Sequence, residues 1–68
     1  MTTQQLITPI KVIDTNTDYV VCVYDVKGMY HITLYDCVFR KNVMKFGKYL
    51  ERVLAENKAR EIAKQYTI

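Results

Sequence analysis

The sequence predicts an α+β domain, a three-stranded antiparallel β-meander followed by a C-terminal helical region. β-Branched and aromatic residues flank a two-residue turn at Lys27-Gly28, which is typical of a β-hairpin. Apolar residues in the second half of the chain recur at helical spacing instead. Strands followed by helices are typical of the α+β class. We expect residues 1–68 to form a single domain, because a chain this short can bury only one modest core.

The first strand is expected at about residues 6–14. It contains Pro9, which has no amide hydrogen to donate to a neighbouring strand, so the strand belongs at a sheet edge or carries a bulge. The segment from Asp14 to Asp18 is rich in Asp, Asn and Thr, and these residues favour turns. This segment is expected to lead into the second strand.

The second and third strands are expected at residues 19–26 and 29–36, as a hairpin. Because a two-residue turn fixes which residues lie opposite each other, the register follows from the position of Lys27-Gly28. The expected pairs are Tyr24 with His31, Val23 with Ile32, Cys22 with Thr33, and Val21 with Leu34.

Alternation along the hairpin separates two faces. One is the natural core: Tyr19, Val21, Val23, Tyr30, Ile32 and Leu34. The other lacks the charges typical of a solvent-facing sheet, so we expect something to cover it. Its candidate binding residues are Val20, Tyr24, Met29, His31 and Tyr35. Three coverings stay open: the terminal helix of the same chain, a protein partner, or the bases of a nucleic acid.

Residues 40–54 are expected to form an amphipathic helix. Its apolar side would carry Val43, Phe46, Leu50, Val53 and Leu54. On the other side, cations recur at i, i+4, i+7 and i+11, spacings that share one side of a helix. This candidate basic face comprises Arg40, Lys41, Lys45, Lys48 and Arg52.

The apolar pattern changes sides after Leu54. On one straight helix the later stripe would lie roughly opposite the earlier one. We therefore expect the helical region to kink or break near residues 55–57, with Asn57 as a cap and a second helical segment at 56–66. In one alternative, a single long helix uses the later stripe to bind a second copy of the chain. In another, residues 48–54 form a strand and only the last segment is helical. The candidate dimer face comprises Ala59, Ile62, Ala63 and Tyr66.

Charge is distributed unevenly along the chain. Residues 1–36 carry a net charge of −2 and residues 37–68 a net charge of +5, which gives +3 overall. This asymmetry favours an acidic partner, either a nucleic acid or the acidic surface of a protein.

The residues that carry chemistry are sparse. The chain has no serine, one histidine, and two cysteines whose spacing matches no zinc site. We therefore expect no enzymatic activity, no cofactor, no metal, and reduced thiols. The longest apolar run, residues 19–24, is too short to span a membrane, and the first residues do not resemble a signal peptide. A cytoplasmic location is expected.

Two functions fit these observations. The first is a small regulatory or inhibitory protein, of the kind that phages and mobile elements encode, which docks on the acidic or apolar surface of a partner protein. Proteins that handle nucleic acid are among the candidate partners. The second is a non-specific nucleic-acid-binding protein that places its basic face against phosphates.

Overall fold

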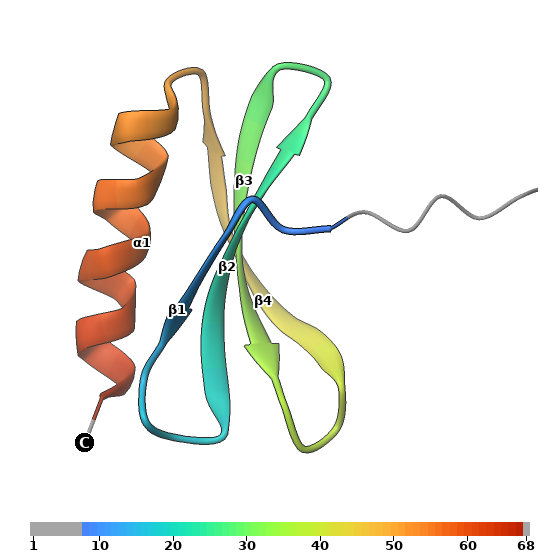
Figure 1. Ribbon diagram of the computed structural model, residues 1–68, viewed down its shortest axis with the longest axis vertical. Helices are drawn as coiled ribbons and strands as arrows, with labels where there is room; N and C mark the ends of the chain where they lie inside the picture. The colour runs from blue at the N-terminus through green and yellow to red at the C-terminus, as the bar shows by residue number, and fades with distance from the viewer. Residues whose placement is uncertain (1–7, 68) are drawn as a thin grey trace, which may run out of the picture.

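Four strands and one helix follow one another along residues 8–67, the part of the chain that the computed structural model describes (Figure 1). The strands pair antiparallel in chain order, β1-β2-β3-β4, and the α+β class is confirmed. The expected three strands become four. The elements are β1 (Lys11–Asp14), β2 (Tyr19–Val26), β3 (Met29–Asp36), β4 (Lys41–Tyr49) and α1 (Arg52–Tyr66).

The β2–β3 hairpin has the predicted register, with Tyr24 opposite His31 and Val21 opposite Leu34. Lys27 and Gly28 have φ angles of 53° and 81°. Positive φ at both central residues defines the type I′ turn, whose twist matches that of the strands it joins. The Gly28 amide also donates a hydrogen bond to Asp25 Oδ1 over 3.2 Å. The hairpin prediction is confirmed.

The first strand is shorter than expected. β1 begins at Lys11, two residues after Pro9, and pairs with β2 only. The part of the prediction that covers residues 6 and 7 lies outside the described residues. The expected turn follows β1, where the Asn16 amide donates to Asp14 Oδ1 over 2.8 Å.

The predicted helix over residues 40–54 is wrong for most of its length, and only its last three residues, 52–54, are helical, as the start of α1. Residues Lys41–Tyr49 form β4, which pairs with β3 along its length. Its register shifts twice, once opposite His31/Thr33 and once opposite Leu34/Tyr35. Each shift adds a residue to β4, and such β-bulges break the two-residue alternation of a strand. Because of these bulges, the apolar and basic residues of β4 recur at a spacing close to that of a helix, which explains the wrong prediction.

The helix α1 is continuous, so the predicted break near residues 55–57 is also wrong. It begins after Glu51 rather than at Asn57, and Glu51 makes no side-chain capping bond. The change in the apolar pattern instead marks the passage from β4 to α1. The alternative of a strand over 48–54 with only the last segment helical is correct for residues 48 and 49 and for the single C-terminal helix of the described residues, but α1 already begins at Arg52.

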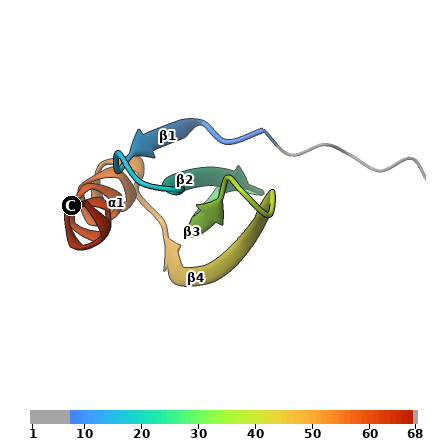
Figure 2. The same ribbon diagram turned by 90° about the horizontal axis from the view of Figure 1, so that it is seen from below.

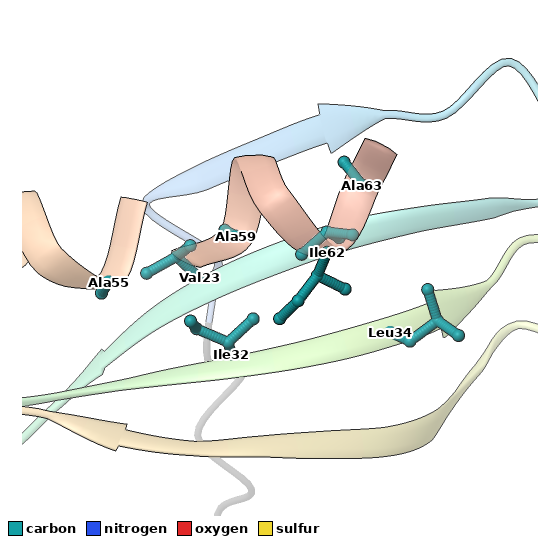
Figure 3. Close-up of a cluster of buried hydrophobic side chains, with 8 residues drawn as sticks. Val23, Ile32, Leu34, Ala55, Ala59, Ile62 and Ala63 are labelled. Carbon is teal, nitrogen blue, oxygen red and sulfur yellow. The ribbon is translucent and has the colours of Figure 1, made fainter. Parts of the chain in front are cut away.

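The core lies between α1 and one face of the sheet (Figure 3). From the sheet come the buried residues Val21, Val23, Ile32 and Leu34, and from the helix Ala55, Ala59, Ile62 and Ala63. Three of the four helical residues are alanines, which allow the helix axis to approach the strands closely. Seen along the strands, the helix lies to one side of the sheet, beside β1 and β2 (Figure 2).

The residues predicted as a dimer face belong to this core. Ala59 and Ile62 are 0% and 2% exposed, and Tyr66 packs against Tyr19 with ring centroids 6.2 Å apart. A stripe buried inside its own chain is not free to bind a second copy. The residues predicted as the apolar side of the first helix are mostly exposed, with Leu50 at 77%, and of these five only Phe46 packs against the core. Within residues 8–67, no helix is both long and apolar enough to cross a membrane.

Candidate functional site

The sheet has one face that α1 does not cover, which we call the open face. All five residues predicted for the sheet's binding face belong to its alternation along β2 and β3: Val20, Tyr24, Met29, His31 and Tyr35. Each of them is partly buried. The expectation that the terminal helix covers this face is wrong, because α1 packs on the opposite one (Figure 3).

The strand β4 adds two lysines to the open face. Lys48 lies opposite His31 and Lys45 lies opposite Thr33. The Thr33 hydroxyl also donates a hydrogen bond to Asn42 Oδ1 of β4 over 3.0 Å. The open face therefore joins part of the predicted basic face to the predicted aromatic face.

The bulge at Gly47 is what brings the two lysines together. In a regular strand, residues three apart point to opposite faces. Gly47 has a φ of +100°, a conformation that side chains other than glycine's rarely adopt, and it lies where the β4 register shifts against His31/Thr33. The extra residue restores Lys48 to the face that carries Lys45.

The other predicted basic residues lie elsewhere. Lys41 is opposite Asp36, on the alternation of the covered face. Arg40 lies in the β3–β4 turn with a φ of 56°. Arg52 lies in the first turn of α1 and bonds Glu56. The predicted stripe of five cations on one helical face is therefore wrong, because these residues come from a turn, a bulged strand and a helix.

Shallow hollows follow the centre of the open face. One, of about 280 Å³, is lined by Tyr24, Val26, His31, Thr33, Asn42 and Lys45. A second shares His31, Thr33 and Lys45 with it and extends to Lys48. A third, lined by Val20, Tyr24 and Tyr35 among others, lies on the β1 side. The first two hollows share three lining residues and form one trough across β2, β3 and β4, whereas the third shares only Tyr24 with it.

The cations of the helix and those of the sheet differ in their partners. On α1, Glu56 bonds Arg52 at 2.6 Å and Arg60 at 3.5 Å, and Lys58 lies 3.8 Å from Glu61. Among the described residues, Lys45 and Lys48 form no ion pair. Their charge is thus available to a ligand.

Burial favours the uncharged form of two titratable groups on the open face, Cys22 and Tyr24. Desolvation raises the pKa of the Cys22 thiol, and it likewise raises the pKa of the Tyr24 hydroxyl. Both groups are therefore protonated at neutral pH. Cys22 offers no thiolate nucleophile to the neighbouring strand, and the lysines supply the charge at this part of the open face.

Other chemistry has little support in this part of the chain. The two cysteines are free, Cys22 buried and Cys37 exposed. Over residues 8–67, no three His, Cys, Asp or Glu side chains gather as metal ligands would. The arrangement is suited to binding through aromatic rings, apolar side chains and two ammonium groups.

Comparison with known proteins gives no relative. No protein-family model, curated protein sequence or solved structure matches this chain. The function is therefore inferred from the geometry and the charge of the open face.

The sequence did not reveal that Lys45 and Lys48 lie on the same face as the predicted aromatic residues. It also did not place Asn42 in the trough. Gly47 was the available signal, because glycine inside a strand often marks a bulge and inside a helix is unfavourable.

Proposed function

We propose that this protein is a non-enzymatic nucleic-acid-binding protein that uses the open face of its sheet. The observation that carries the proposal is the meeting of Lys45 and Lys48 with Tyr24 and His31 on that face. Phosphate contacts from lysine supply most of the affinity of non-specific nucleic-acid binding. Aromatic rings beside them give the bases a surface to stack on.

The distribution of carboxylates supports an anionic ligand. The three glutamates of the chain all lie at 51–61, in or next to α1, and two of them hold helix cations. The aspartates lie at strand ends and turns, where Asp14, Asp25 and Asp36 accept backbone hydrogen bonds. Lys45 and Lys48 lie on the edge strand β4, at the border of the open face, and form no ion pair with a carboxylate of residues 8–67.

A salt titration of nucleic-acid binding tests the proposal. The logarithm of affinity should fall linearly with the logarithm of salt concentration, by about 0.7 to 0.9 per phosphate contact. The double variant Lys45→Gln, Lys48→Gln should bind more weakly, with a slope that is shallower by about 1 to 2. Binding that is undetectable at low salt to both single-stranded and duplex probes would overturn the proposal.

The matched control changes the same charge on the other side of the molecule. Lys58→Gln, Lys64→Gln also removes two positive charges, but from α1. If net charge alone attracts the ligand, both double variants lose affinity equally. If the open face is the site, the β4 variant loses much more.

A second candidate is a regulatory or inhibitory protein, of the phage accessory type, which docks on a partner protein. Exposed apolar side chains at the two ends of the sheet favour it. Phe39 in the β3–β4 turn is 72% exposed, and Leu50 and Val53 at the β4–α1 junction are 77% and 67% exposed. A pull-down from the natural host tests this candidate by comparing the wild type with the variants Phe39→Ser and Leu50→Ser. A stoichiometric protein partner lost with either variant would support it.

A further inference from the structure

The register aligns the open face into rows that run across the strands. In one row Tyr24, His31 and Lys48 lie on β2, β3 and β4. In the next row the corresponding residues are Cys22, Thr33 and Lys45. Both rows end in a lysine on β4, which is an edge strand of the sheet. In the first row aromatic rings lie towards the centre, and in both rows an ammonium group lies at the border.

Within one row, the spacing of the strands sets the distance between the aromatic residues and the lysine. Neighbouring strands are about 4.8 Å apart, so the backbone of Lys48 is roughly 5 Å from that of His31 and roughly 10 Å from that of Tyr24. A base stacked on Tyr24 or His31 would have its sugar directed towards β4. Its phosphate would then lie beside the lysines.

A duplex does not fit this arrangement as well. In a double helix the flat faces of the bases are stacked on one another, so a flat aromatic platform has nothing to stack on. The face also includes apolar residues such as Val20, Val26 and Met29, which would lie against charged phosphates if a duplex were bound. Single strands expose both the bases and the backbone.

We propose that the open face binds single-stranded nucleic acid, with bases on Tyr24, His31 and Tyr35 and the sugar-phosphate backbone along β4. This inference rests on the proposed function and specifies its ligand. The third aromatic residue, Tyr35, lies opposite Val20 and lines the hollow on the β1 side together with Tyr24. It extends the stacking surface along the strands, so that more than one base is held.

The test compares four ligands by fluorescence anisotropy at low salt: a short oligodeoxythymidylate, the matching oligouridylate, a duplex of the same length, and polyglutamate. The intact protein should bind the deoxy strand about tenfold or more tightly than the duplex. The two single strands distinguish a DNA ligand from an RNA ligand. Polyglutamate should bind weakly, because it offers charge but no base to stack.

Tyrosine variants separate stacking from charge. Tyr24→Leu and Tyr35→Leu should each weaken single-strand binding about tenfold and leave duplex binding nearly unchanged. Tyr24→Phe keeps the ring and should retain the affinity, which guards against a variant that merely misfolds. The urea midpoint of each variant is measured alongside.

The outcomes distinguish the two proposals. If no nucleic acid binds, the proposed function fails and the inference fails with it. If duplex and single strand bind equally and only the lysine variants weaken them, the proposed function stands and the single-strand inference is overturned. Polyglutamate that binds as tightly as the oligonucleotides would also overturn it, and would point to an acidic protein partner instead.

Discussion

The two faces of this sheet are made from alternate residues of the same strands, yet they have opposite roles. On the covered face, Val21, Val23 and Ile32 are fully buried under α1. On the open face, the intervening residues Tyr24 and His31 are only partly buried and are accompanied by lysines from β4. Val21, Val23 and Ile32 therefore stabilise the fold, whereas the partly buried Tyr24 and His31 are accessible to a ligand. Adjacent positions in the sequence should therefore respond very differently to substitution.

The largest expected effect is on stability, at the covered face. Ile32→Ala should lower the free energy of unfolding by about 2–5 kcal/mol, because it removes buried methyl groups and leaves a cavity. A domain of this size has few kcal/mol to lose. The loss is measured as a shift of the urea unfolding midpoint at unchanged m-value.

The matched control for Ile32→Ala lies on the open face of the same strand. Met29→Ala should cost about 1 kcal/mol or less, since Met29 is not part of the core. Equal losses in both variants would show that the open face is itself packed, and the contrast between the faces would be lost.

The close approach of α1 to the sheet predicts the next effect. Ala59 is fully buried between helix and strands. Ala59→Leu should therefore lower the free energy of unfolding by about 1–3 kcal/mol through overpacking. Gln65→Leu places the same side chain on the exposed side of α1 and should change the urea midpoint little. If Ala59→Leu is neutral or stabilising, the helix does not pack as tightly as described.

The bulge at Gly47 determines which face of the sheet Lys48 occupies. Substitution of Gly47 should lower the free energy of unfolding by less than the two changes above. A Cβ added there meets no atom within 4 Å, so the cost arises from the backbone φ of +100° rather than from a clash. Gly47→Ala should lower the free energy of unfolding by about 1–2 kcal/mol.

Gly47→Asn serves as the control for the bulge, because asparagine tolerates positive φ better than alanine does. It should lose less stability than Gly47→Ala in the same urea titration. Alanine that is tolerated as well as asparagine would contradict the positive φ, and with it the shared face of Lys45 and Lys48.

The ion pairs of α1 predict the smallest effect, and it depends on pH. The hydrogen bond from Arg52 lowers the pKa of the Glu56 carboxyl. A depressed pKa in the folded state contributes stability above the unfolded pKa, and this contribution is lost as the pH falls through the folded pKa. Glu56→Gln should thus be slightly less stable than the wild type at neutral pH, and the difference should vanish in acid.

Urea midpoints measured between about pH 7 and about pH 3 test this. Glu61→Gln is the control, because its contact with Lys58 is longer, at 3.8 Å, and the Glu61 side chain is 68% exposed. A Glu56→Gln difference that persists at low pH would mean that the ion pair is not its source.

The hairpin was predictable because its determinants are local. A glycine at the second turn position and β-branched residues on both sides fix the turn, and the turn fixes the register of β2 on β3. Both faces of the hairpin follow from that register. The residues of the open face on these two strands were therefore correctly grouped from the sequence alone.

β4 was not predictable in the same way. Its two bulges arise from pairing with β3, and apart from Gly47 no residue of Lys41–Tyr49 marks where an extra residue lies opposite β3. The lysine spacing matched a helix, and the exposed Leu50 and Val53 completed a false apolar stripe. The bulges determine which face of the sheet each lysine occupies. The placement of Lys45 and Lys48 beside the aromatic residues could therefore not be predicted without the register of β4 on β3.

The position of β4 at the sheet edge also affects whether copies of the protein associate with one another. An edge strand exposes unpaired backbone groups to which a strand of another molecule can add, and bulges and lysines are features that prevent such growth. Lys41, Lys45 and Lys48 lie on this edge beside the bulges. The lysines that hold a ligand in our proposal would also keep copies of the protein apart. Variants that neutralise them should be checked for self-association by light scattering before a loss of binding is interpreted.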